Sequence, residues 1–469
     1  MAPTAPVAPA RRPLATLLPM IVAVLLLPAA LGSSGTIFND GDVSWHIATG
    51  QWIIAHQAIP SVDPFSFTWA GQPWVPIEWA AELAMAAVFA LSGYAGIAAL
   101  ATLALGVLHG LVYFNAVRFV RPWAAAASVV AMDLVLVPMT LARPHLLAWP
   151  LIALWTLVML RARQQGRAPP LLWALLMVLW ANLHGSFVMG LAIAGAFGLD
   201  ALVAEKGKGR VIRQWGLFGL ACLAAVIVNA NGVEGVLHPL KIANLAMLPL
   251  IDEWKPSNPS VTPFFFVVLA GAAVAIWRFR PRLSPVRWLL LGALIALAML
   301  QVRHQAVLAI VAAIILPAGF AKVREMAAPD RRLLWLAAFG LSGLVLVRAA
   351  LPLEPPESET NPWQLIAAVP AELHDQPVLN GYSMGGPLIL SGIRPYVDGR
   401  GDMYGDTFVV GYKKITDGDA AELAAATERW NLRWAILPRR YTKLLALLDR
   451  TPGWRRIAEQ PSGVIYVRE

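Results

Sequence analysis

Residues 14–32, LATLLPMIVAVLLLPAALG, are followed at residues 33–77 by SSGTIFNDGDVSWHIATGQWIIAHQAIPSVDPFSFTWAGQPWVPI. The first stretch is apolar and close to the ~20 residues that cross ~30 Å of hydrocarbon as a helix. The second stretch is too long and too rich in acidic, aromatic and glycine residues for a simple connector. We therefore predict a membrane-spanning helix followed by a large loop that folds onto the membrane surface.

Ten further apolar runs follow this loop. The composition agrees with a membrane protein, because 58% of the 469 residues are hydrophobic and only 14% are charged. The fold class we predict is an α-helical polytopic membrane protein of about 11 transmembrane helices. The predicted spans are Leu14–Gly32, Ala95–Val117, Trp123–Met139, Leu146–Leu160, Leu171–Leu183, Phe187–Val203, Trp215–Asn229, Pro263–Ile276, Trp288–Leu300, Gln305–Phe320 and Leu333–Leu351.

The positive charges give this topology a direction. The net charge of +9 is gathered in short basic clusters between apolar runs, which indicates topology signals and no nucleic-acid partner. With a cytoplasmic N-terminus, the basic connections are all cytoplasmic, and the acidic loops lie on the outer side. The basic connections are Arg118–Arg121, residues 161–167, residues 206–213, residues 278–287 and Lys322–Arg332.

Two segments leave alternatives open. The run from Leu14 to Leu31 follows Arg11 and Arg12 and resembles a signal peptide, but its length and the later spans favour an uncleaved first helix. Residues 77–93 could be one more span, which would invert everything downstream. We interpret them as an amphipathic helix on the outer surface, with Glu78 and Glu82 on its polar side. The first outer loop then covers residues 33–93.

The chain changes character after Leu351. A Pro/Glu-rich linker leads into sequence of ordinary soluble composition, so we predict a transmembrane domain at 1–351 and a small α/β extracytoplasmic domain at 352–469. The expected strands are Pro377–Leu379, Arg394–Asp398, Trp434–Leu437 and Gly463–Val467, and the expected helices are Ala420–Trp430 and Tyr441–Leu448. In the segment Asp398–Gly405 we expect turns and a surface pair of Asp and Arg.

The acidic motif in the first outer loop is the main candidate for chemistry. Asp40 and Asp42 flank a glycine, an arrangement suited to a divalent cation or to a base beside a cation. On a helix that begins near Asp42, His46 shares the same face. The alternative is that Asp40 or Asp42 only caps this helix.

Several polar turns fall at the outer ends of the predicted spans. Polar groups at that depth are costly unless they face a cavity or hydrogen-bond the helix ends, and both interpretations remain open. Arg303 is the best candidate for gripping a lipid-linked phosphate, and Glu253 beside Trp254 suits a sugar. The candidates are Arg143, His145, Asn182, His184, Glu253, Trp254, Arg303 and His304.

A long first outer loop with an Asp-x-Asp-like motif at Asp40–Asp42, many spans and a soluble outer C-terminal domain resembles the GT-C superfamily of glycosyltransferases. The resemblance implies an enzyme of the bacterial cell envelope, in the cytoplasmic (inner) membrane, that transfers a sugar from a polyprenyl-phosphate-linked donor to a lipid, glycan or protein acceptor. It implies that Asp42 is the base or a metal ligand, with Asp40 as its helper and Mg²⁺ or Mn²⁺ as the cofactor. The chain lacks the WWDxG motif of the oligosaccharyltransferases, which leaves the acceptor class open.

Two other functions compete with this one. An envelope polysaccharide polymerase or ligase also joins lipid-linked sugars but relies on Arg and His. A lipid or sugar transporter needs charges at mid-membrane, where Asp133 is the candidate; Asp200, near the inner end, is expected to pair with Lys or Arg. Neither a Walker A loop, a GxSxG elbow nor an HExxH motif is present in the sequence, so ATP-driven transport and metalloprotease activity lack support.

Overall fold

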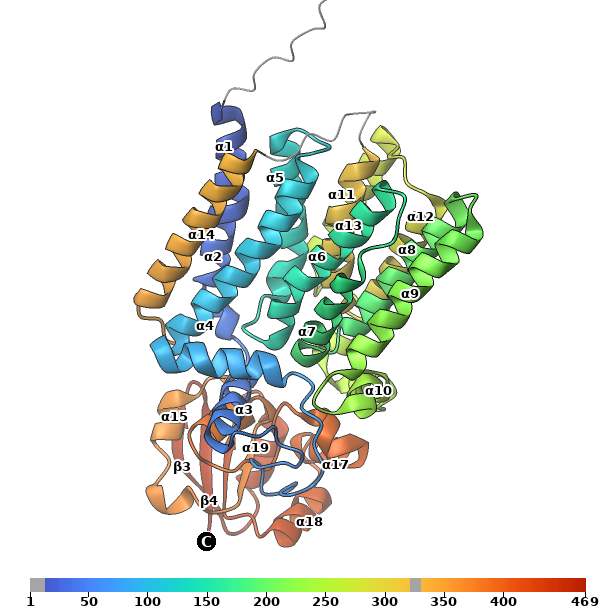
Figure 1. The fold of residues 1–469 in the computed structure, drawn as a ribbon. Helices are drawn as coiled ribbons and strands as arrows, with labels where there is room; N and C mark the ends of the chain where they lie inside the picture. Colours follow the sequence, from blue (N-terminus) through green and yellow to red (C-terminus); the bar gives the residue numbers. More distant parts are fainter. Residues whose placement is uncertain (1–12, 321–329) are drawn as a thin grey trace, which may run out of the picture.

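A computed structural model describes residues 13–320 and 330–469 and shows a helical bundle with an α/β domain at one end (Figure 1). The first helix runs through α1, a π-helical turn and α2. Several of the following helices begin with proline at the first turn, where its missing N–H costs nothing. The bundle helices are α1 Pro13–Ile21, α2 Leu27–Gly32, α4 Trp79–Ala116, α5 Pro122–Leu136, α6 Pro144–Gln164, α7 Leu175–Leu183, α8 Phe187–Ala204, α9 Lys208–Ile227, α11 Pro263–Phe279, α12 Pro285–Leu300, α13 His304–Gly319 and α14 Arg331–Ala350.

Each of the eleven predicted spans falls on an apolar helix. Six helices of the described chain are long and apolar enough to cross a membrane, and five more are apolar but shorter, so the count of eleven spans stays a prediction. The six are Trp79–Ala116, Pro122–Met139, Pro144–Gln164, Phe187–Ala204, Lys208–Ile227 and Arg331–Ala350.

The α4 helix contains the segment whose topology was open. Its helical geometry breaks at Ser92 and at Gly93, where φ is +59°, a value that glycine adopts without strain. Figure 1 shows the first part of α4 lying across the end of the bundle and the second part running along it. This arrangement agrees with a surface helix over the first part of α4 and a single span after the kink.

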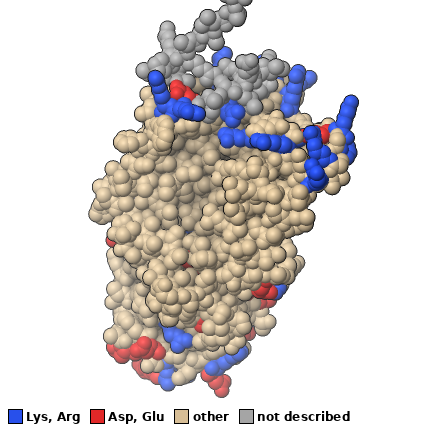
Figure 2. All heavy atoms as spheres, in the orientation of Figure 1, with Lys and Arg blue, Asp and Glu red and all other residues tan. Residues whose placement is uncertain are grey.

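The charges separate along the molecule. Figure 2 shows Lys and Arg gathered at the end of the bundle away from the C-terminal domain, a middle belt almost free of charge, and mixed charges over that domain. In Figure 1 the first outer loop, α10 (Gly232–Ile242) and the C-terminal domain lie together at the opposite end from α1. The acidic loops and the C-terminal domain therefore share one side of the bundle.

The C-terminal domain is built on a four-stranded sheet in the order β1-β2-β4-β3. β1 pairs with β2 in parallel, with Leu379 opposite Ala435, and the other neighbours pair antiparallel. The elements are α15 Trp363–Ala367, β1 Val378–Asn380, α16 Gly385–Leu390, α17 Gly401–Thr416, α18 Ala420–Trp430, β2 Trp434–Leu437, α19 Thr442–Leu448, β3 Trp454–Gln460 and β4 Gly463–Arg468.

The predicted strand Arg394–Asp398 is wrong. Its extended backbone is bound by the side chain of Asn380, whose Oδ1 accepts from the Tyr396 amide at 2.7 Å and whose Nδ2 donates to the Val397 carbonyl at 2.7 Å. A side chain thus replaces the backbone ladder of a strand. The edge strand β3 and the helix α17 were not predicted from the sequence.

The C-terminal domain shares a core with the first outer loop. Trp45 and Ala48 of α3 (Asp42–His56) and Trp74 of the same loop pack with Tyr396, Tyr404 and other buried side chains of the domain. α3 also packs on α16. The division at residue 351 remains a prediction, but the start of α3 is held between the bundle and the C-terminal domain.

Candidate functional site: an acidic centre around Arg143

Asp40 and Asp42 both pair with Arg143. Asp42 is the first residue of α3, and Arg143 immediately precedes α6, so the two ends of separate helices meet here. The Arg143 guanidinium forms an ion pair with Asp42 and lies 3.2 Å from Asp40 Oδ2. Asp40 Oδ1 also accepts a hydrogen bond from the Asp42 amide at 3.0 Å. Asp40 therefore braces the start of α3 and contributes charge to the centre.

A third carboxylate reaches the same guanidinium. Glu253 lies in the short 3-10 helix Asp252–Trp254, and its Oε2 is 3.7 Å from Arg143 Nη1. Burial raises the pKa of Asp42 to about 7 against the opposing effect of Arg143. Burial acts in the same direction on Glu253, but Arg143 and Arg303 outweigh it and hold its pKa below the ordinary value. The centre thus contains one carboxylate that titrates near neutral pH and one that stays ionised.

Two histidines and two glutamates form a second group beside the first. Glu78 lies 3.4 Å from His184 Nε2 and 3.9 Å from His46 Nε2, and His46 Nδ1 is 3.1 Å from Glu82 Oε1. Burial raises the pKa of Glu78 to about 8. Burial, reinforced by Arg143, lowers the pKa of His46 well below its ordinary range. At neutral pH the buried imidazole is therefore neutral, and Glu78 carries a proton.

The other predicted residues at these turns divide into two kinds. His184 Nδ1 accepts from the Ser186 amide at 3.1 Å, which leaves its Nε2 to donate to Glu78. The ring centroids of His145 and His184 are 6.3 Å apart. Asn182 accepts from Trp79 Nε1 and donates to the Val178 carbonyl of its own helix and to the Val228 carbonyl at the end of α9. His184 and His145 thus line the centre, whereas Asn182 ties helix ends together.

Arg303 approaches the centre from another side. Its guanidinium stacks on Trp254 at 4.1 Å from the ring centroid, and its backbone amide donates to the Glu253 carbonyl at 3.0 Å. Within the part of the chain that the structure describes, Arg303 forms no ion pair, although its charge affects Glu78, Glu253 and His184. It is therefore a cation that is positioned by Trp254 and is not paired with a carboxylate among the described residues. His304 follows it as the first residue of α13.

Glycines of the C-terminal domain press against this centre and were missed in the sequence. A Cβ atom added at Gly399 would overlap the carboxylate of Asp42, and one at Gly386 would overlap the Gly41 carbonyl. Gly41 in turn touches the Ser383 carbonyl so closely that it has no room for a side chain. The glycine-rich sequences 385–386 and 399–401 were the only available signal. The C-terminal domain therefore forms one wall of the acidic centre.

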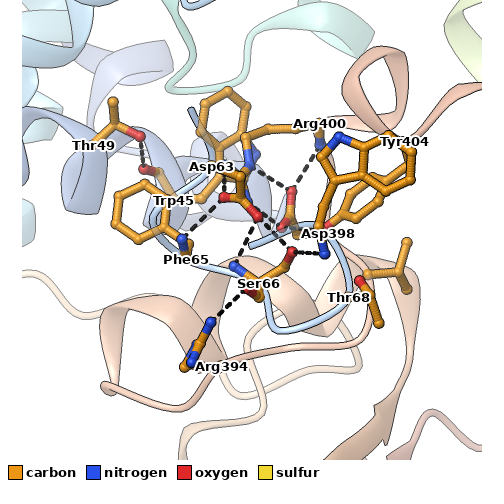
Figure 3. Close-up of polar contacts among 12 residues, drawn as sticks. Trp45, Thr49, Asp63, Phe65, Ser66, Thr68, Arg394, Asp398, Arg400 and Tyr404 are labelled. Carbon is orange, nitrogen blue, oxygen red and sulfur yellow. Dashed lines mark hydrogen bonds and ion pairs between the residues drawn. The ribbon is translucent and has the colours of Figure 1, made fainter. Parts of the chain in front are cut away.

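A buried ion cluster fixes that wall in place (Figure 3). Arg400 donates to Asp398 through Nε at 2.8 Å and Nη2 at 2.7 Å, and its Nη1 donates to Asp63 of the first outer loop at 2.7 Å. Tyr404 and Ser66 donate hydroxyl hydrogen bonds to Asp398 and Asp63. The expected surface pair is therefore wrong, because Arg400 is 1% exposed and both aspartates are sealed from solvent.

The carboxylates of this centre are already paired with a cation, which bears on the metal ion expected from the sequence. Among residues 13–320 and 330–469, no group of three or more His, Cys, Asp or Glu side chains is arranged to hold a metal ion. Asp40 and Asp42 converge on the Arg143 guanidinium, which takes the place between them. The carboxylates therefore do not fit a metal ion while Arg143 stays there, and Mg²⁺ or Mn²⁺ remains a prediction from the sequence.

A cavity of about 250 Å³ opens between the first outer loop, α10 and the start of α17. Its wall includes Trp74, His238 and Asp402, and His238 Nε2 lies 2.9 Å from Asp402 Oδ2. The Asp402 carboxylate is close enough to contribute to the raised pKa of Glu78. The cavity thus lies where the first outer loop and α10 meet the C-terminal domain.

Asp133 and Asp200, outside this centre, both have partners. Asp200 pairs with Arg163 at 3.1 Å and with Arg287 at 3.0 Å, as expected from its position near the basic end. Asp133 lies 2.9 Å from His109 Nε2 in the bundle core.

Comparisons with known proteins place the fold. No family model matches the chain, and no curated protein matches it either. Among solved structures, the archaeal oligosaccharyltransferase AglB from Archaeoglobus fulgidus, in complex with an inhibitory peptide and a dolichol-phosphate, is similar with a TM-score of 0.57 and 10% identity, over 96% of this chain and 74% of that one. The apo form of an oligosaccharyltransferase from the same organism is similar with a TM-score of 0.55 and 11% identity, over 97% and 74%. The chain thus shares its overall fold with these oligosaccharyltransferases.

Proposed function

We propose that this chain is a membrane glycosyltransferase that moves a sugar from a polyprenyl-phosphate-linked donor to an acceptor at the outer face of the cytoplasmic membrane. The observation that carries the proposal is the convergence of Asp40, Asp42, Glu253 and Arg143 where the bundle meets the C-terminal domain. In this proposal, the site at this junction receives the head of a membrane lipid from the side of the bundle and an aqueous acceptor from the side of the C-terminal domain. The shared fold supports the same class of reaction, because one structural neighbour was solved with a dolichol-phosphate.

Asp42 is the general base in this proposal. Transfer requires that the acceptor nucleophile lose a proton, form a bond to the anomeric carbon of the sugar, and displace the lipid phosphate with its bonding electrons. A base works best when its pKa lies near the working pH, and burial brings the pKa of Asp42 to about 7. The acceptor proton passes to the Asp42 carboxylate, and Asp40 holds the start of α3 in place through the Asp42 amide.

Arg303 is the group that stabilises the departing phosphate. A leaving group that gains negative charge in a region of low dielectric needs a cation already positioned for it. Arg143 is occupied by three carboxylates, whereas Arg303 is held on Trp254 with no ion pair among the described residues. We therefore assign the phosphate to Arg303, and the acceptor to the cavity lined by Trp74, His238 and Asp402.

The test is transfer by the purified full-length protein in lipid nanodiscs, with a panel of undecaprenyl-phosphate sugars and release of undecaprenyl phosphate as the readout. Loss of general-base catalysis costs on the order of 10²–10⁴-fold in rate. We expect Asp42→Asn to lose activity on this scale. The matched control is Asp252→Asn, which removes a carboxylate that is 94% exposed on the same side of the bundle. Full activity of Asp42→Asn would remove Asp42 from the mechanism.

Sidedness has its own test. Cys222 is buried and is the only cysteine of the chain, so single exposed cysteines can be added with little background. A membrane-impermeant maleimide applied to intact cells should label Ala55→Cys of α3 and Ala420→Cys of α18 and should leave Arg167→Cys unlabelled until the membrane is opened. Labelling of Ala55→Cys and Arg167→Cys from the same side would contradict the proposed topology.

A further inference from the structure

The guanidinium of Arg143 occupies the position between the two aspartates of the acidic motif. Arg143 Nη1 lies 3.2 Å from Asp40 Oδ2 and 3.7 Å from Glu253 Oε2, and Nη2 pairs with Asp42. The carboxylates come from the segment before α3, from the first residue of α3, and from a 3-10 helix that lies more than 200 residues later in the chain. One guanidinium therefore gathers three acidic groups that the sequence keeps apart.

We propose that Arg143 is the resident cation of this centre and stands in the position that a divalent metal ion would otherwise take between Asp40, Asp42 and Glu253. A guanidinium matches carboxylates through a planar set of N–H donors, which spaces the acceptor oxygens along its edge. A Mg²⁺ ion needs its oxygen ligands at about 2.0–2.1 Å around a single point. The two cations therefore compete for one place.

Arg143 is held there by the backbone around it. Its amide donates to the Leu141 carbonyl at 2.8 Å, and Pro144 fixes the first turn of α6 directly after it. Its side chain is 21% exposed, and the side chains of Asp40 and Asp42 are 16% and 12% exposed. A cation in this half-buried position favours the ionised form of the carboxylates, and its presence does not depend on the concentration of metal ions.

The consequence for the chemistry is a division of work between the two arginines. Arg143 pairs with the Asp42 carboxylate and orients it, so it is a positioning residue, and Arg303 is left for the phosphate. This part of the inference depends on the function proposed above. The competition between Arg143 and a metal ion does not, and it can be measured without any substrate.

The experiment is a titration of the full-length protein in nanodiscs with Mn²⁺, followed by electron paramagnetic resonance and by the thermal unfolding midpoint. We expect the wild type to show no saturable Mn²⁺ site and no change of midpoint with Mn²⁺ or a chelator. Arg143→Met frees three carboxylates and should gain a saturable site and a midpoint that rises with Mn²⁺. Arg303→Met is the matched control and should gain neither, since Arg143 still occupies the centre.

Two more variants make every outcome decisive. Arg143→Met combined with Asp42→Asn should lose the gained site, and Arg143→Lys should not acquire one because the ammonium keeps a cation in place. A saturable Mn²⁺ site in the wild type that Asp42→Asn removes would overturn the proposal. A folded Arg143→Met protein without such a site would overturn it as well. If transfer fails in every assay while the titrations behave as expected, the proposed function is at fault and the assignment of Arg143 stands.

Discussion

The chain builds the same ionic group twice, with opposite surroundings. Arg143 meets Asp40 and Asp42 with its side chain 21% exposed, and Arg400 meets Asp63 and Asp398 with its side chain 1% exposed. Around Arg400, hydroxyl and backbone groups donate further hydrogen bonds to the aspartate oxygens. In the cluster around Arg143, by contrast, Asp40 Oδ2 accepts no hydrogen bond from the described residues and is approached only by the ion pair. The sealed cluster can only hold segments together, and the open one has capacity left for chemistry.

The two clusters are also connected. Arg400 is bound to Asp398 on one side, and Gly399 between them touches the carboxylate of Asp42. The sealed cluster thus sets the distance between the C-terminal domain and the open cluster. Damage to the first should lower stability and damage to the second should lower activity, and this contrast can be tested directly.

The largest loss of stability is expected for Arg400→Met. Removing one partner of a buried ion cluster leaves uncompensated buried charge and costs about 3–5 kcal/mol. The full-length protein should therefore lose thermal stability by a wide margin. Arg394→Met is the control, because Arg394 donates to the Ser66 carbonyl of the same loop at 3.0 Å but is exposed. Arg143→Met should cost less than Arg400→Met, since solvent reaches its carboxylates, and equal losses would erase the distinction between the clusters.

An intermediate effect is expected for Gly399→Ala. The added methyl group would overlap the Asp42 carboxylate, and forcing extra atoms into a packed position costs about 1–3 kcal/mol. Because the displaced group is the proposed base, we expect a large loss of transfer rate and only a small decrease of the thermal unfolding midpoint. Gly411→Ala in α17 is the matched control, since its methyl group would meet only the tip of the Glu422 side chain at 3.2 Å. Normal activity of Gly399→Ala would separate the C-terminal domain from the reaction.

The open cluster was partly predictable from the sequence and the sealed one was not. Asp40, Asp42, Arg143 and Arg303 stand at the ends of apolar runs, where the topology already restricts them to one side. Asp63 and Arg400 lie 337 residues apart, and no local pattern connects them. The turn-rich sequence around Asp398 indicated only a loop.

The same physical limit explains the errors in the C-terminal domain. β3 was missed because WRRIAEQ is an edge strand with several exposed polar and charged side chains, so it lacks apolar alternation. The strand predicted at Arg394–Asp398 has the apolar pattern but takes its hydrogen bonds from Asn380. The positions of the apolar helices were predictable because a long apolar run has few alternatives to a helix in a membrane.

The smallest effect concerns pH. Burial raises the pKa of Asp42 to about 7 and that of Glu78 to about 8. In the unfolded chain these two carboxyl groups have their ordinary pKa values near 4, so between about pH 4 and pH 8 the folded protein holds protons that the unfolded chain has released. The free energy of unfolding should therefore fall as the pH rises from about 4 to about 8. Asp42→Asn and Glu78→Gln should each flatten this slope. Transfer should rise through pH 7 as Asp42 loses its proton, because only the carboxylate can accept one. A rate that falls over this interval would mean that the protonated form is the active one, and Asp42 would then act as an acid.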